Sequence, residues 1–126
     1  RPFSIVHATQ FFEFLLSIAD AAAERGQVRV ARAMVQPIAA DDVATAVLDV
    51  AFAAPTGGIS EFAGPERFRL DAAVRARLRA SRDPRQVTSD PLASYFGTNL
   101  SEEDLLPTAD ATIMPKRFDE WLNRVA

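Results

Sequence analysis

Hydrophobic positions along the chain recur at two spacings, that of a strand and that of a helix. Short runs with strand spacing alternate with longer segments with helical spacing. Val28 and Val30 alternate with polar neighbours, which is the spacing of a half-exposed strand. The β-branched pair Ile5-Val6 passes through small polar residues into a helical pattern, as a buried parallel strand does when it leads into a helix. Four strands are predicted: Ser4–Ala8, Gln27–Ala31, Ile59–Ala63 and Gln86–Ser89.

Helical spacing governs the longer segments. Phe11, Leu15 and Ile18 form one apolar row, and a parallel row of apolar residues lies beside it. A helix is therefore predicted over Gln10–Glu24, and the same reasoning predicts three more. They run from Asp41-Asp42 to Pro55, from Ala72 to about Ala80, and from about Lys116 to Val125.

Residues at the predicted helix ends have the chemistry of caps. Asp41-Asp42 and Asp71 are expected to cap helix starts, because a short carboxylate accepts hydrogen bonds from the first amides. Gly26 is expected to end the first helix. Ser101–Asp104 is expected to form a capped single turn of helix.

Strands that alternate with helices indicate the α/β class, with few short strands and three or four amphipathic helices in one domain over residues 1–126. These strands are too few for an independent doubly wound sheet. The expectation is the trailing part of a larger sheet, an α+β unit by itself, or a chain that pairs with its own copy. Arg1 in place of Met favours a processed chain or a piece of a longer one.

Composition excludes several function classes. The 126 residues contain no cysteine, which rules out disulfides, thiolate metal sites and cysteine nucleophiles. A net charge of -3 gives no reason to expect nucleic acid. No apolar run is long enough for a membrane span and no signal peptide is evident, so a cytoplasmic protein without a membrane partner is expected.

The candidate chemistry is densest at the end of the first predicted strand. His7, Thr9 and Gln10 supply polar groups there, next to Phe11 and Phe12. Ligands of α/β sheets lie outside the carboxyl ends of strands, and polar groups beside aromatic walls suit a small-molecule pocket. A structural alternative stands beside each role. His7 is an acid/base or a buried histidine bonded to backbone, Thr9 holds a ligand or caps the helix, and the phenylalanines line a pocket or fill the core.

Other segments contribute further candidates. Met34, Gln36, Tyr95 and Phe96 are predicted to line the same substrate pocket, although residues 95–97 are also consistent with a packed surface loop. Asn99 stands four residues after Tyr95, so the Tyr-x-x-x-Lys pair of ordinary short-chain dehydrogenases is absent. No metal site is expected, because the single histidine has no acidic partner at ligand spacing. No catalytic residue is assigned.

Four motifs, in order, resemble the NmrA-like atypical short-chain dehydrogenases. Ser4–Phe14 is similar to the family's strand and "Arg-Ala-Thr-Gln-Phe" segment, with His7 in the usual place of Arg. The other three are Val35–Ala44, with its "Asp-Val-Ala" helix start, Phe62–Glu66, with "Gly-Pro-Glu", and Phe118–Leu122, with an aromatic and acidic C-terminal helix.

The resemblance implies a Rossmann-type fold and a parent protein that is an NAD(P)H-dependent oxidoreductase. The family binds NADP or NAD through a glycine-rich loop, which these residues lack, so this chain alone is expected to bind no dinucleotide and to form the substrate-side portion. A small-molecule substrate and a homo-oligomer are expected. The alternative is a regulatory or protein-interaction module that self-associates without turnover.

Overall fold

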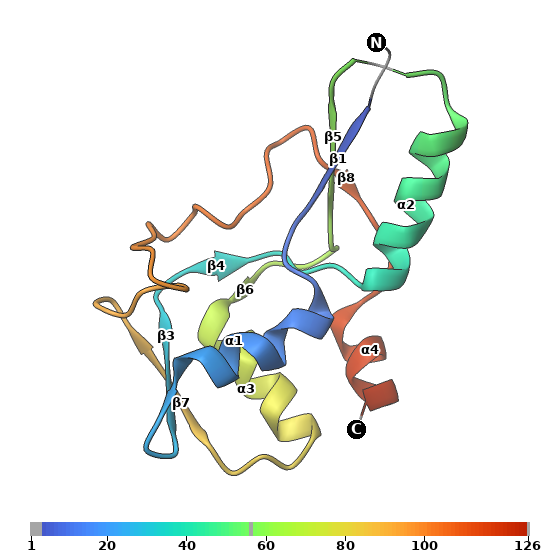
Figure 1. Cartoon of the computed structure of the whole chain (residues 1–126). Helices are drawn as coiled ribbons and strands as arrows, with labels where there is room; N and C mark the ends of the chain where they lie inside the picture. The colour runs from blue at the N-terminus through green and yellow to red at the C-terminus, as the bar shows by residue number, and fades with distance from the viewer. Residues whose placement is uncertain (1–3, 56, 126) are drawn as a thin grey trace.

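The computed structural model describes residues 4–55 and 57–125, which form four α-helices and eight strands in three small sheets (Figure 1). The helices are α1 (Leu15–Ala22), preceded by the 3-10 helix η1 (Phe12–Phe14), α2 (Ala40–Phe52), α3 (Leu70–Ala80) and α4 (Phe118–Val125). The strands are β1 (Ile5–Ala8), β2 (Ala23–Glu24), β3 (Gln27–Ala31), β4 (Met34–Val35), β5 (Ile59–Ala63), β6 (Phe68–Arg69), β7 (Gln86–Asp90) and β8 (Thr112–Ile113). The α/β class is confirmed in its coarse form, as a mixture of helices with parallel and antiparallel pairs.

The first sheet contains only parallel strands, in the order β1-β5-β8. Helix α2 runs alongside it (Figure 1), and a small apolar cluster fills the space between them. Its buried members are Ile38, Ala46 and Phe62. Ile5 and Ile59 stand opposite each other in the register of β1 and β5, and their side chains are 43% and 62% exposed. The sheet is therefore uncovered where these two residues lie.

The second sheet joins β2, β3 and β7. β3 and β7 run parallel, so their carboxyl ends meet at Ala31 and Asp90. β2 and β3 form a hairpin whose turn residues Arg25 and Gly26 have φ values of 53° and 77°. Two consecutive left-handed residues give a turn whose twist matches that of the strands. Gly26 thus serves a hairpin, and its expected role as a helix cap is wrong.

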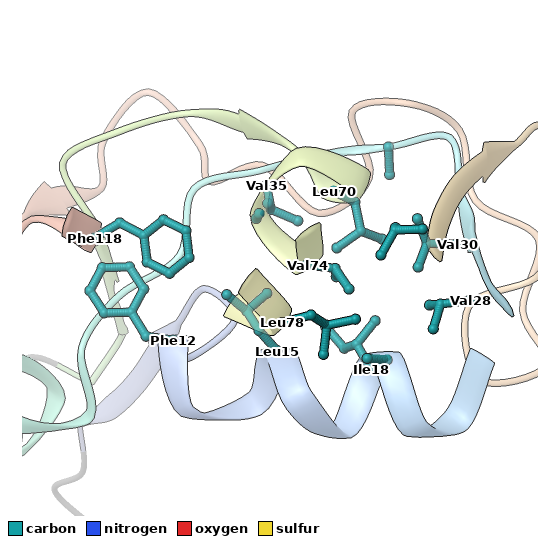
Figure 2. Packing of buried hydrophobic residues seen from close by; sticks show 14 of the residues in the cluster. Phe12, Leu15, Ile18, Val28, Val30, Val35, Leu70, Val74, Leu78 and Phe118 are labelled. Carbon is teal, nitrogen blue, oxygen red and sulfur yellow. The ribbon is translucent and has the colours of Figure 1, made fainter. Parts of the chain in front are cut away.

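The main core lies between α1, α3, β3 and α4, in the lower half of Figure 1. Figure 2 shows Leu15 and Ile18 from α1 directed at Val74 and Leu78 from α3, with Phe12 and Phe118 at one end. The apolar row predicted for the first helix is buried here, except that Phe11 is 37% exposed. Phe12 is completely buried, so it belongs to the core and lines no pocket.

The first helix is shorter than the predicted Gln10–Glu24. Ile38 N–H donates to Gln10 O, and Phe12 N–H donates to Ile38 O, so Phe11 forms a bridge with Ile38 and the backbone stays extended there. At the other end, the hairpin draws Ala23–Glu24 into a strand. Both ends are set by pairing with distant or turn-linked residues, which local periodicity does not report.

The predicted caps are also wrong. Extended Ala39 and Arg69 precede α2 and α3, so Asp41, Asp42 and Asp71 lie inside the first turns. The Ala40 amide is capped from another element, by Oε1 of Glu13 at 3.1 Å. Negative charge in a first turn still favours the helix dipole, so the acidic residues support the helices without capping them.

Two further predictions change in detail. Residues 102–105 form turns in place of the expected single turn of helix, with the Ser101 N–H and Oγ both donating to the Asp104 carboxylate. The last helix begins at Phe118, two residues after the predicted Lys116.

Candidate functional site

The carboxyl ends of β1 and β5 are joined by the segment that crosses between them. Thr9 Oγ1 donates to Gln36 O at 2.6 Å, and Thr9 N–H donates to Phe62 O at 3.1 Å. Gln36 Nε2 donates to Gly64 O at 2.9 Å, and Arg67 Nε donates to Gln36 Oε1 at 3.1 Å. Thr9 and Gln36 are buried. These bonds hold together the segments that follow β1, β4 and β5. They lie at the end of the sheet where an α/β protein places its ligand.

Two predicted site residues are therefore used in this internal network. The Thr9 hydroxyl donates to the Gln36 carbonyl, and neither η1 nor α1 has a side-chain cap. Both ends of the Gln36 amide have partners within the chain, Gly64 and Arg67. We assign Thr9 and Gln36 the role of holding the sheet edge in shape, beneath any surface that meets a substrate.

Gln10 and Tyr95 come together from distant parts of the sequence. Burial is the larger influence on the Tyr95 phenol and raises its pKa, and the nearby Gln10 side chain lowers it by a smaller amount. A raised pKa keeps the phenol protonated near neutral pH, where it acts as a donor and not as a tyrosinate base. This is the opposite of the lowered pKa that the Tyr-x-x-x-Lys pair produces.

An aromatic patch continues from this pair. The Phe96 ring lies 4.9 Å from the Tyr95 ring, edge to face, and 5.5 Å from the Phe14 ring, stacked. Phe14 and Phe96 are 38% and 53% exposed. A cavity of 190 Å³ beside Tyr95 and Phe96 is bounded by α1 and β3. The aromatic patch is thus formed by Phe14, Tyr95 and Phe96, and the predicted Phe11 and Phe12 are not part of it.

His7 lies on the outer side of the first sheet. It is exposed, so the alternative of a buried histidine is wrong. It faces its register partner Glu61 across β1 and β5, in an open groove of 480 Å³ that also includes Thr108 and Asp110. An imidazole beside a carboxylate is a usable acid/base group, and its exposure leaves it accessible.

The Glu61 carboxyl in this groove has a lowered pKa. Thr108 Oγ1 and N–H donate to the same oxygen, Oε1, at 2.5 and 2.9 Å, and they lower the pKa of the carboxyl below its ordinary value near 4.5. Nearby His7 adds a smaller effect in the same direction. Hydrogen bonds to the charged form explain the shift.

A pH-dependent contribution to stability follows from this shift. Because the folded-state pKa is lowered, the Glu61 contribution is complete above the unfolded value near 4.5 and is lost as pH falls through the folded value. We expect Thr108→Ala to raise the titration midpoint of Glu61, followed by carbon-13 NMR of the carboxyl. Ser60→Ala, on the same strand, serves as the control. An unchanged midpoint in Thr108→Ala would contradict the assignment.

The predicted site residues therefore do not share one pocket. His7 lies in the groove on the first sheet, Gln10 with Tyr95 and Phe96 lies by α1, and Met34 lines a third cavity of 370 Å³. That third cavity also includes Arg32 and Asp71, which the sequence reasoning did not connect. The one available signal was Asp71 between two arginines, at Arg69 and Arg75.

Comparison with known proteins adds no family. No family model matches the chain, and neither the search of curated proteins nor that of solved structures finds a match. Within residues 4–55 and 57–125, no helix is long and apolar enough to cross a membrane. The same residues hold no group of three side chains of the kinds that bind metals.

Proposed function

We propose that this chain is the substrate-side portion of an NAD(P)H-dependent oxidoreductase of the NmrA-like type. The observation that carries the proposal is β1, which is an edge strand of an all-parallel sheet within the described residues. Sheets made only of parallel strands normally have both faces covered. Here Ile5 and Ile59 are exposed on one face, so the sheet has the form of one end of a larger one.

The free edge of β1 has a defined hydrogen-bonding pattern. Ile5 N–H donates to Gly58 O, just before β5, at 3.0 Å, and Thr9 N–H donates to Phe62 O in β5 at 3.1 Å. Alternate residues of a strand point the other way, so the amides of Val6 and Ala8 face the free edge. A further parallel strand would use these two donors.

A groove beside the same edge would accept the helix that accompanies such a strand. It has a volume of 270 Å³ and lies between β1 and α2, with Val6 on one side and Val47 and Ala51 on the other. Side chains of β-branched and small residues suit helix packing at short distance. The dinucleotide would then be bound by the added unit, in agreement with the absence of a glycine-rich loop from these residues.

In this arrangement the chain supplies substrate contacts at the carboxyl ends of its strands. His7 is the accessible acid/base group, and protonated Tyr95 beside Gln10 is a neutral hydrogen-bond donor. The dinucleotide would provide the hydride. These two groups lie in separate places, so one substrate carbonyl would meet only one of them. A carbonyl or quinone group suits either, because its oxygen gains negative charge as hydride is transferred.

The test is NADPH and NADH oxidation by the complete protein that contains this chain, with quinones and small carbonyl compounds as acceptors. We expect turnover that falls at least tenfold in Ala8→Pro, which removes a free-edge donor without disturbing the β1–β5 bonds. Ala8→Gly is the matched control, because glycine keeps the backbone N–H that proline lacks. Dinucleotide binding without turnover would favour a regulatory role, and full activity in Ala8→Pro would exclude strand addition at β1.

A specific observation also favours the second candidate, a self-associating interaction module. Helix α2 has a second apolar side turned away from the sheet, where Leu48 and Phe52 are 57% and 87% exposed. Apolar side chains concentrated on one exposed helix face are typical of interfaces. Light scattering of the isolated chain tests this candidate: a dimer that dissociates in Leu48→Asp supports self-association through α2, and a monomer at all concentrations excludes it.

A further inference from the structure

We propose that the cavity at the carboxyl ends of β3 and β7 binds a small organic monocarboxylate with an apolar body. This site is separate from the His7 groove and from the free edge of β1, so it does not depend on the oxidoreductase proposal. Its volume of 370 Å³ lies within the range of small-molecule sites.

The cavity lies where strand ends and a helix start converge. The parallel pair β3 and β7 ends at Ala31 and Asp90, and the cavity residues Arg32 and Pro91 follow directly. Opposite them, Arg69 immediately precedes α3, and Leu70 N–H donates to Ala33 O at 2.8 Å. The carboxyl ends of parallel strands are the usual ligand position in α/β proteins, and a helix start favours negative charge.

Two guanidinium groups face this space, and each is held by only part of its donor set. Arg69 directs Nε and Nη2 at the two oxygens of Asp71, both at 3.1 Å, which orients its remaining Nη1 donor. Arg32 directs Nε at Glu102 Oε1 at 2.8 Å. The side chains of Arg32 and Arg69 are 65% and 66% exposed, so their other N–H groups are accessible to a ligand. Arginine in a fixed orientation suits paired hydrogen bonds to a carboxylate.

Asp71 makes this arrangement rigid. Its side chain is only 7% exposed, and it also accepts from Arg75 Nη2 at 3.3 Å, whose Nη2 further donates to Val87 O at 3.0 Å. Because Asp71 is buried and paired with two arginines, its carboxylate stays in place when a ligand binds Arg69. Arg69 is thus preoriented, and ligand binding does not have to order it.

The charge balance selects the ligand. Among the residues that line the cavity, the positive charges of Arg32 and Arg69 are offset by the negative charges of Glu102 and Asp71. Without a surplus of positive charge, the cavity suits a monoanion better than a phosphate dianion.

The remaining walls favour a ligand with an apolar body. Ala33, Met34 and Pro91 supply apolar surface, and Ser89 adds one hydroxyl. A carboxylate attached to an apolar group therefore matches both parts of the cavity.

The experiment titrates the full chain with benzoate and follows amide signals by two-dimensional NMR. Saturable shifts are expected at Met34, Leu70 and Ser89, and benzyl alcohol, which has the same ring without the charge, should leave them unchanged. Shifts spread over the whole surface, or equal shifts with benzyl alcohol, would overturn the proposal. Tighter binding of phenyl phosphate than of benzoate would overturn the assignment of a monocarboxylate.

Three variants assign the binding to the cavity. Arg32→Gln should weaken benzoate about tenfold, because it removes a charged donor while the Asp71 network remains. Glu102→Gln should strengthen it about threefold, because it releases Arg32 and removes a negative charge. Arg79→Gln, on the exposed side of α3, is the control with no expected change. Equal affinities in all three variants would show that benzoate binds elsewhere.

Discussion

Phe12→Ala is expected to destabilise the fold by about 4 kcal/mol, the largest effect of any substitution considered for this chain. Phe12 is completely buried, and its ring centroid lies 5.1 Å from that of Phe118 and 5.6 Å from that of Trp121. Truncation removes these aromatic contacts and leaves a cavity between η1 and α4. The loss is a large share of the stability of an ordinary domain, about 5–15 kcal/mol.

Phe11→Ala is the matched control, because the two phenylalanines are adjacent in the sequence. The Phe11 side chain is 37% exposed, and its structural contribution is the backbone bridge to Ile38, which alanine retains. We expect a loss of about 1 kcal/mol or less. Chemical denaturation followed by Trp121 fluorescence measures both variants, and similar losses in the two would contradict the assignment of Phe12 alone to the core.

Gly64→Ala is expected to cost about 3 kcal/mol, because there is no space for a methyl group at this position. A Cβ atom built on Gly64 would lie 1.5 Å from Pro37 O and 2.5 Å from Pro37 C. Both atoms belong to the backbone, so no side-chain rotation relieves the clash. The crossing segment would have to move away from the end of β5.

Gly97→Ala separates this effect from the general conformational cost of losing a glycine. Gly97 has φ +81° but nothing within 4 Å of a built Cβ, so only the left-handed backbone is penalised, by about 1 kcal/mol. Thermal unfolding of the two variants should show the larger decrease in Tm for Gly64→Ala. A larger decrease for Gly97→Ala would mean that the Pro37 backbone yields without cost.

The Gly64 substitution also tests how the sheet edge is held. Gly64 O accepts from Gln36 Nε2, and Gly64 N–H donates to Gln36 O at 3.3 Å, so a shift at Gly64 changes the position of Gln36. Gln36 O is also the acceptor of the Thr9 hydroxyl. One methyl group would therefore disturb the ends of both β1 and β5.

Much of the secondary structure could be predicted from local pattern. The expected strand Gln27–Ala31 and the expected strand Ile59–Ala63 match β3 and β5 residue for residue, and β1 and β7 each differ by one residue at one end. Helices α2, α3 and α4 occur near their predicted ranges. Periodicity is sufficient there because each segment has one buried side, and burial of that side stabilises the element.

The errors fall where a partner distant in the sequence decides the outcome. β4 and β6 have two residues each, and β8 also has two, so no period can be read from them. They are strands only because Met34 pairs with Arg69 and Thr112 pairs with Phe62. The start of α2 is likewise capped by Glu13, a residue distant in the sequence.

The candidate site shows the same division. The sequence alone determined the residue types at the end of the first strand, the absence of cysteine chemistry and of a glycine-rich phosphate loop, and the amphipathic sides of the helices. Only the tertiary structure decided that Thr9 and Gln36 are internal supports, that Gln10 meets Tyr95, and that Arg32 and Arg69 line one cavity. The physical reason is range: residue type and period are local properties, whereas hydrogen-bond partners and cavities depend on chain segments that meet only on folding.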